Sequence, residues 1–130
     1  MERANGTRGR ILIVEDDAVI CRLCQVVLTG DGFEVDIASN GKIAQEKLAK
    51  CDYALLIIDL RMPMNGQEFY QFLAVKFPML LSKVIFTTGD TLSQETRHFL
   101  ESSKKPLLSK PFGPQDLKAI VSKTLIGLGK

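Results

Sequence analysis

Short apolar segments alternate along the chain with longer segments in which apolar residues recur every three or four positions. The short segments are rich in β-branched residues, which predicts strands, and the longer ones have the spacing of amphipathic helices. The predicted strands cover residues 11–14, 33–37, 54–58, 84–87 and 106–108. A predicted helix follows each strand, so the chain repeats one strand and one helix five times.

Apolar stripes and boundary residues define the five predicted helices. In chain order the stripes are Val19, Ile20, Leu23, Val26 and Val27; Ile43, Ala44 and Leu48; Phe69, Phe72, Leu73 and Phe77; Leu92, Phe99 and Leu100; and Leu117, Ile120, Val121 and Leu125. Residues 29–32, which include two glycines, end the first helix. Ser39 and Ser93 are the expected N-caps of the second and fourth helices. Pro78 ends the third helix, and Pro114 lies in the first turn of the fifth.

The alternation of strands and helices predicts an α/β fold with a doubly wound, five-stranded parallel sheet covered on both faces. Residues 11–14 and 55–58 are almost continuously apolar, as in central strands, whereas residues 33–37 alternate, as in an edge strand. An edge position for the second strand favours the order 2-1-3-4-5, in which ligands bind beyond the carboxyl ends of the first and third strands. We expect a single domain over residues 10–127, after a flexible tail of residues 1–9.

Composition and charge narrow the class of protein. The 130 residues are 45% hydrophobic and 25% charged, the balance of an ordinary globular domain. No apolar run reaches the roughly 20 residues that span a bilayer. The start of the chain lacks the apolar core of a signal peptide, so we expect a cytoplasmic protein without membrane contact. The net charge of +2 is too small to indicate direct nucleic acid binding, and Arg3, Arg8 and Arg10 are interpreted as part of a solvated tail.

The three cysteines favour neither a disulfide framework nor a zinc site. Cys21 and Cys24 form a CxxC pair inside a predicted helix, and the remaining zinc ligands, Cys51 and His98, are distant in sequence. We therefore expect ordinary buried thiols. His98 is expected on a helix surface or half-buried, and not as a ligand.

Polar side chains follow four of the five predicted strands. They are Glu15, Asp16 and Asp17 after the first, Asp59 after the third, Thr88 and Gly89 after the fourth, and Lys110 after the fifth. The carboxyl ends of parallel strands meet at one edge of the sheet, so these groups should converge. Carboxylates roughly 4–5 Å apart repel by on the order of 3–4 kcal/mol per pair at an effective dielectric constant near 20. This repulsion favours protonation or a bound cation, and an all-oxygen site open to water suits Mg²⁺.

The same residue types match the needs of phosphoryl transfer. A carboxylate can attack phosphorus to form an acyl phosphate, while a metal ion neutralises the transferred group. Lys110 and Thr88 can pair with phosphoryl oxygens. Each residue also has an ordinary explanation by itself, in a turn or, for Asp16 and Asp17, as a helix N-cap. Their arrival at a single edge, on a topology inferred separately, favours a phosphoryl-accepting site.

Four segments resemble the signature segments of response-regulator receiver domains in two-component signalling. They are ILIVEDD, LLIIDLRMPMNG, VIFTTG and LLSKPF, and the resemblance extends from about residue 10 to residue 125. The resemblance implies a flavodoxin-like (βα)5 fold and a phosphoryl group taken from a phosphohistidine. The donor would be a sensor histidine kinase or a histidine phosphotransfer protein.

The resemblance also implies roles for individual residues. Glu15 and Asp16 would hold Mg²⁺, with Asp16 the more direct ligand, Asp59 the phosphoacceptor and ligand, and the Arg61 backbone carbonyl a further ligand. Thr88 would be the switch hydroxyl and Lys110 the phosphate-pairing lysine. Met62, Pro63 and Gly66 match the loop that leads into the third helix. Beyond Mg²⁺-dependent self-phosphorylation and autodephosphorylation, no enzymatic activity is expected of the domain itself.

Two positions depart from the family pattern. Receivers commonly carry a tyrosine or phenylalanine, which changes rotamer on phosphorylation, where this chain has Leu107. Ser103 and Lys104 replace a frequent Gly-Ala pair before the fifth strand. We expect phosphorylation to be intact. We expect the response to it near helix four, strand five and helix five to be weak or to pass through other residues. Arg61 and Asp90 are expected to flank the route of water to the acyl phosphate and to tune its lifetime.

Several functions remain as alternatives at this stage. An aspartyl phosphohydrolase would need an Asp-x-Asp pair after the first strand, and a nucleotide-binding domain would need a glycine-rich loop, neither of which is present. A receiver that only binds partners would typically have lost Asp59 or Lys110. The segments TTGDTLSQETRHFLE and KPLLSKPF resemble those of receivers in hybrid sensor histidine kinases, so we expect such a kinase as the parent protein. The alternative is a free-standing single-domain regulator. Docking would use the first helix, where Val19, Ile20 and Leu23 must be divided between core and partner.

Overall fold

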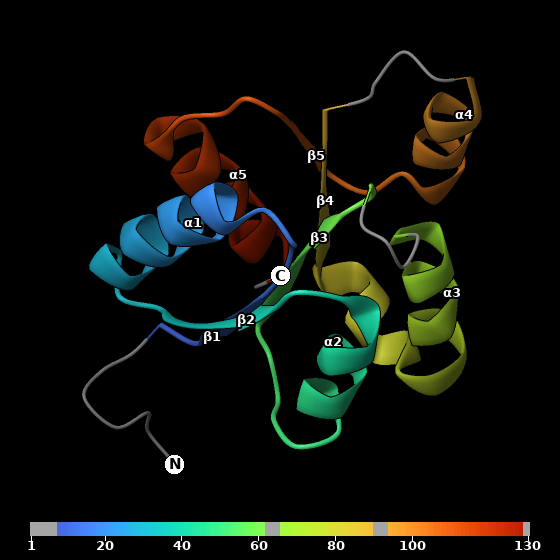
Figure 1. Ribbon diagram of the computed structural model, residues 1–130, viewed down its shortest axis with the longest axis horizontal. Helices are drawn as coiled ribbons and strands as arrows, with labels where there is room; N and C mark the ends of the chain where they lie inside the picture. The colour runs from blue at the N-terminus through green and yellow to red at the C-terminus, as the bar shows by residue number, and fades with distance from the viewer. Residues whose placement is uncertain (1–7, 62–65, 90–93, 129–130) are drawn as a thin grey trace.

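Five strands and six helical segments alternate along the chain, which is described here by a computed structural model over residues 8–61, 66–89 and 94–128 (Figure 1). In order they are β1 (Arg10–Val14), α1 (Ala18–Gly30), β2 (Glu34–Ala38), α2 (Gly41–Leu48), β3 (Leu55–Asp59), α3 (Gly66–Lys76), the 3-10 helix η2 (Pro78–Lys83), β4 (Val84–Thr88), α4 (Gln94–Ser103), β5 (Leu107–Ser109) and α5 (Pro114–Leu128). The predicted strands are all present, with boundaries that differ by at most one residue, and each of the five predicted helices is present. The short helix η2 was not predicted; it begins at Pro78, whose fixed φ suits a first helical turn.

The strands form one parallel sheet in the order β2-β1-β3-β4-β5, which confirms the predicted topology. Helices α1 and α5 cover one face, and α2, α3 and α4 lie on the other (Figure 1). In the register Val14 lies opposite Ile58, and Asp59 lies opposite Thr87. The carboxyl ends of β1, β3 and β4 therefore lie side by side.

Side chains of the central strands alternate between two apolar cores. Ile11 and Ile13 pack on the α1 and α5 side, whereas Leu12 and Val14 pack on the α2 and α3 side. All residues of β3 and β4 are buried, as predicted for central strands of a parallel sheet. Strand β2 is only partly buried, which confirms its edge position. The sheet is thus a rigid support for whatever its carboxyl edge carries.

The buried face of α1 differs from the predicted stripe. Cys24 and Leu28 enter the core, while Val19 and Val26 are 76% and 56% exposed. Ile20, Leu23 and Val27 are partly buried at the margin of the core. The reason is that Cys24 and Leu28, one helical turn apart, point at the sheet, which places Val19 and Val26 on the outer side.

The N-cap of α2 is Asn40 and not the predicted Ser39. The Asn40 side chain accepts a hydrogen bond from the backbone N–H of Ile43 at 2.8 Å. The acceptor lies three residues before the donor, the usual spacing of an N-cap bond. The predicted cap Ser93 and the stripe residue Leu92 lie outside the described residues.

The thiols are only partly as predicted. Cys24 is buried, Cys21 is half-buried and Cys51 is exposed, and none of them is in a disulfide. Burial raises the pKa of Cys21 to about 11 and that of Cys24 to about 12, so both remain protonated at neutral pH. His98 is exposed on α4, as expected.

Two arginines assigned to the tail are bound to the edge strand β2 or to the turn before it. The Arg8 backbone N–H donates to the Gly32 carbonyl at 2.8 Å, and its guanidinium pairs with Asp31 at 3.1 Å. Arg10 belongs to β1 and pairs with Glu34 and Asp36. The solvated-tail interpretation is therefore wrong for both arginines, because the turn before β2 offers Arg8 a carboxylate and a backbone carbonyl, and β2 offers Arg10 two carboxylates. In the described part of the chain no helix has the length and apolar character to cross a membrane.

The backbone at Lys104, before β5, has a conformation that favours glycine. Lys104 adopts φ = 58° at the end of α4, and its N–H donates to the Leu100 carbonyl at 3.1 Å. This left-handed conformation at a helix end is one that glycine adopts without steric cost. We expect Lys104→Gly to raise the free energy of unfolding by up to about 1 kcal/mol, measured by urea denaturation. Lys105→Gly is the matched control and should lower it; a loss of stability in Lys104→Gly would contradict the assignment.

Candidate functional site

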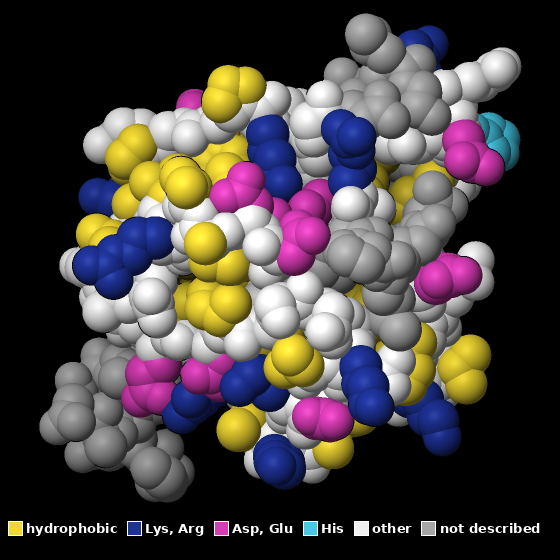
Figure 2. Space-filling model, viewed as in Figure 1, with side chains coloured by type: hydrophobic (Ala, Val, Ile, Leu, Met, Phe, Trp, Pro, Cys, Tyr) yellow, Lys and Arg dark blue, Asp and Glu magenta, His cyan; other side chains and the backbone are white. Residues whose placement is uncertain are grey.

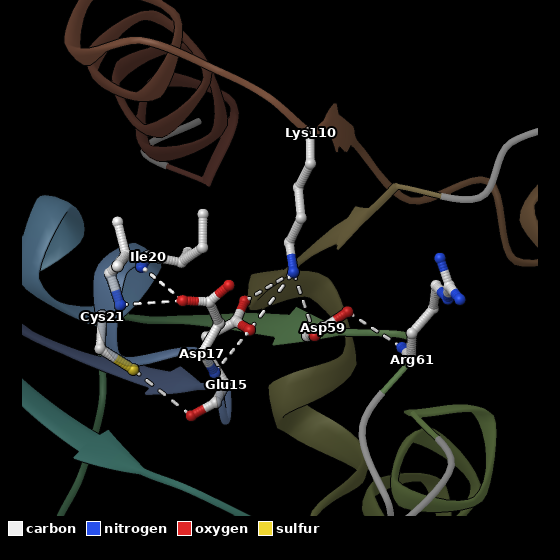
Figure 3. A network of polar contacts seen from close by, with 8 residues as sticks. Glu15, Asp17, Ile20, Cys21, Asp59, Arg61 and Lys110 are labelled. Atoms are coloured by element: carbon white, nitrogen blue, oxygen red, sulfur yellow. Dashed lines mark hydrogen bonds and ion pairs between the residues drawn. The ribbon is translucent and has the colours of Figure 1, made fainter.

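Four strands deliver polar side chains to one edge of the sheet, and Figure 3 shows three of them, Glu15, Asp59 and Lys110, pointing toward one another. Glu15 follows β1, Asp59 ends β3, Thr88 ends β4 and Lys110 follows β5. The Lys110 N–H donates to the Thr88 carbonyl at 3.0 Å, which keeps the end of β5 beside the end of β4. The predicted convergence of these residues is therefore present in the fold.

Three carboxylates lie close together at this edge. One oxygen from each of Glu15, Asp16 and Asp59 lies within 4.8 Å of the others. Glu15 and Asp59 are 2% and 3% exposed, whereas Asp16 is exposed. The acidic cluster is thus buried on one side and open to solvent on the other. On the face of the molecule drawn in Figure 2, acidic side chains gather near the middle, beside basic ones.

Lys110 is the counter-charge to the two buried carboxylates. Its Nζ lies 3.0 Å from Glu15 Oε1 and 3.1 Å from Asp59 Oδ2. Burial lowers the pKa of Lys110, but hydrogen bonds to both carboxylates and their charges outweigh burial and raise it. Lys110 therefore stays protonated, and with all three carboxylates ionised the cluster carries −3 + 1 = −2.

Glu15 is the carboxyl group whose pKa is raised at this negatively charged site. Burial raises the pKa of Glu15 to about 7, and the charge of Asp59 adds to the effect. The hydrogen bonds from Lys110 and from the Asp17 N–H act in the opposite direction without cancelling it. In the protein by itself, a proton on Glu15 relieves part of the excess negative charge near neutral pH.

Backbone amides hold the two buried carboxylates in place (Figure 3). The Asp17 N–H donates to Glu15 Oε2 at 3.1 Å, and the Arg61 N–H donates to Asp59 Oδ1 at 2.9 Å. With Lys110 on Oδ2, each oxygen of Asp59 has one donor. The carboxylate is consequently fixed in orientation before any ligand arrives.

The question of which aspartate caps α1 is answered by the contacts of Asp17. Its side chain accepts from the N–H of Val19 at 2.8 Å and of Ile20 at 3.4 Å. Asp17 is therefore the N-cap, and Asp16 belongs to the acidic cluster.

Two neighbouring threonines end β4. Thr88, the predicted switch hydroxyl, is completely buried. Thr87 was not singled out from the sequence: its Cα pairs with that of Asp59 and its carbonyl accepts from the Leu60 N–H at 3.0 Å. Its side-chain hydroxyl is buried without a hydrogen-bond partner among the described residues. A polar residue in an otherwise apolar strand was the only available signal.

Arg61 lies at the rim, and Asp90 lies outside the described residues. The Arg61 side chain is exposed and extends toward Gly89, where an added Cβ would lie 4.0 Å from Nη1. Met62 and Pro63 also lie outside the described residues, and Gly66 begins α3. The peptide bond between Lys110 and Pro111 is cis.

Comparisons with known proteins agree with this geometry. The family model described as "Response regulator receiver domain" matches residues 11–122. The probable transcriptional regulator ycf29 of Pyropia yezoensis is 31% identical over 114 residues, which are 87% of this chain and 51% of that protein. The DNA-binding response regulator MtrA of Mycobacterium tuberculosis is 30% identical over 115 residues, 88% of this chain and 49% of that protein. The chain thus spans about half the length of these two relatives.

Solved structures show the same fold. A CheY-like receiver domain protein from Methanospirillum hungatei JF-1 superposes with a TM-score of 0.82 at 29% identity, covering 92% of this chain and 95% of that one. The response regulator TrrA of Thermotoga maritima superposes with a TM-score of 0.73 at 31% identity, covering 88% and 97%. Since the family model matches most of the chain, this protein belongs to the response regulator receiver domains of two-component signalling.

Proposed function

We propose that the domain accepts a phosphoryl group on Asp59 from a phosphohistidine, with Mg²⁺ at the acidic cluster. The observation that carries the proposal is the placement of three carboxylates within 4.8 Å of one another, two of them paired with Lys110. A purely structural cluster would gain nothing from burying two mutually repelling carboxylates beside an exposed third.

The donor set fits Mg²⁺. It consists only of oxygen atoms, and when all three carboxylates are ionised they and Lys110 together carry a net charge of −2, which matches a divalent cation. Glu15, Asp16 and Asp59 would hold the ion, together with the Arg61 backbone carbonyl. When bound, Mg²⁺ neutralises negative charge on the transferred group. TrrA of Thermotoga maritima, a structural neighbour, was solved in complex with Mg(2+)-BeF, which supports the same chemistry here.

Different residues of the site have different roles in the phosphoryl transfer. An Asp59 carboxylate oxygen forms the new O–P bond, while the P–N bond to the donor imidazole breaks and its electron pair stays on the imidazole nitrogen. The Arg61 N–H orients the carboxylate by its contact with Oδ1. Lys110, now on Oδ2, pairs with a phosphoryl oxygen after transfer, and the Thr88 hydroxyl donates to another.

The donor reaches the site from the exposed side of the cluster. A cleft of about 340 Å³ lies next to Asp16 and is lined by residues of α1 and the end of β2, including Arg22 and Ser39. We propose a sensor histidine kinase or a histidine phosphotransfer protein as the partner. The segments after β4 and around β5 favour the receiver of a hybrid sensor histidine kinase as the parent, and a free-standing regulator is the alternative.

Phosphorylation itself is tested by intact mass. Incubation of the domain with acetyl phosphate and Mg²⁺ should add one phosphoryl group, because the donor set and the nucleophile are already assembled. Removal of Mg²⁺ or the substitution Asp59→Asn should abolish the gain, whereas Asp52→Asn, an exposed aspartate before β3, should retain it. A folded wild-type domain that gains no mass under any of these conditions would mean a receiver that acts by binding alone.

Magnesium affinity should depend on pH through Glu15. Its pKa is raised to about 7, so the metal-free site is largely protonated below that pH and must release the proton to bind a cation. Binding therefore tightens as pH rises, by about tenfold between about pH 6 and about pH 8 if one proton is displaced. Isothermal titration at several pH values measures the effect. Glu15→Gln should bind more weakly and without this slope; a wild-type affinity independent of pH would contradict the role of Glu15.

A further inference from the structure

Three aromatic rings from three different elements form a closed cluster beneath the site. Tyr70 of α3, Phe86 of β4 and Phe99 of α4 have ring centroids 5.4 Å (Tyr70 to Phe86), 5.7 Å (Tyr70 to Phe99) and 5.3 Å (Phe86 to Phe99) apart. The interplanar angles of 58°, 86° and 63° are those of tilted and edge-to-face pairs. Because each ring contacts both others, a movement of any one of them changes the packing of the other two.

One of these rings lies on a strand of the phosphoryl-accepting site, and the other two pack against it. Phe86 precedes Thr88 by two residues on β4, so the two side chains are on the same face of the sheet, and both are completely buried. Helix α3 follows Asp59 in the chain, and α4 follows Thr88. A change at Thr88 can therefore reach Phe86 along β4, and through Phe86 the rings of α3 and α4.

No ring from β5 takes part in this arrangement. The residue paired with Phe86 on β5 is Leu107, which is partly buried against the same core. The rings that pack over Phe86 come instead from α3 and α4. The aromatic side chain that many receivers carry at position 107 is thus absent, and aromatic contacts next to Thr88 are supplied by other elements.

The cluster also has a route to the surface. Tyr70 and Phe99 are half-buried, whereas Phe86 is fully buried. Helix α4 buries no described side chain completely and packs on the core through the half-buried Phe99 and Leu100. An element held in this way shifts at lower cost than the strands, because little apolar surface has to be exposed.

We propose that the Tyr70–Phe86–Phe99 cluster carries the phosphorylation signal from Thr88 to the surface formed by α3 and α4, in place of a ring on β5. The inference rests on the proposed function, since it needs Asp59 to be phosphorylated. Reorientation of Thr88 toward the phosphoryl group changes the space above Phe86, and Tyr70 and Phe99 repack in response. The read-out surface of this receiver is accordingly displaced from β5 toward α3.

The absence of tryptophan and the presence of only two tyrosines make the test direct. In Tyr53→Phe, Tyr70 is the single tyrosine; Tyr53 lies before β3, away from the carboxyl edge, and bonds to Asp36. With acetyl phosphate and Mg²⁺, the ring NMR signals of Tyr70 should shift in proportion to the phosphorylated fraction measured by intact mass. The shift should be smaller in Tyr53→Phe/Phe99→Leu, because Tyr70 then keeps its contact with Phe86 and loses the one with Phe99. Tyr70→Phe is the matched control, in which the Tyr53 signals should stay in place.

The same spectra separate failure of the inference from failure of the proposed function. Full phosphorylation by mass with unmoved Tyr70 signals and shifted Leu107 methyl signals would overturn the cluster and assign the relay to β5. Absence of any mass gain would overturn the proposed function, and the inference with it. Phosphorylation of the Phe99→Leu variant to the wild-type level would show that this variant is folded, so that its reduced Tyr70 shift reports on the ring contact; an unreduced shift would exclude Phe99 from the relay.

Discussion

The contact between Lys110 and two buried carboxylates is the interaction on which the site depends. Glu15 and Asp59 come from different strands, and their burial side by side would be strongly unfavourable without a cation. Lys110 supplies one positive charge from a third strand, and the exposed Asp16 adds a further negative charge. The folded protein therefore has an excess of negative charge at one point of its surface, which a divalent cation or a proton can neutralise.

A rigid sheet makes this arrangement possible. Strands β3 and β4 are buried throughout, and backbone amides after β1 and β3 each donate to a carboxylate oxygen. Hydrogen bonds from the backbone consequently fix the orientation of the carboxylates. Helix α4 lies outside this frame, since none of its described side chains is completely buried. The proposed chemistry therefore lies on the rigid part of the fold, and the proposed read-out on a less deeply packed part.

The sequence could predict the sheet order and most of the site for one reason. Parallel strands separated by helices place their carboxyl ends at a common edge, so Glu15, Asp59, Thr88 and Lys110 are brought together by topology. This conclusion needs only the strand boundaries to within a residue or two. Apolar runs such as 55–58 specify those boundaries well, because a strand buried on both faces is almost entirely apolar.

Tertiary packing decided the features that depend on the rotation of a helix or on contacts between distant segments. The sequence of α1 allows several apolar stripes, and contact with the sheet selected Cys24 and Leu28 over Val19 and Val26. The binding of Arg8 to the turn before β2 and the contact of Tyr70 with Phe99 follow no local pattern. Local periodicity determines which residues are strands and helices, whereas the angle at which a helix meets the sheet is determined by side-chain volumes on both surfaces.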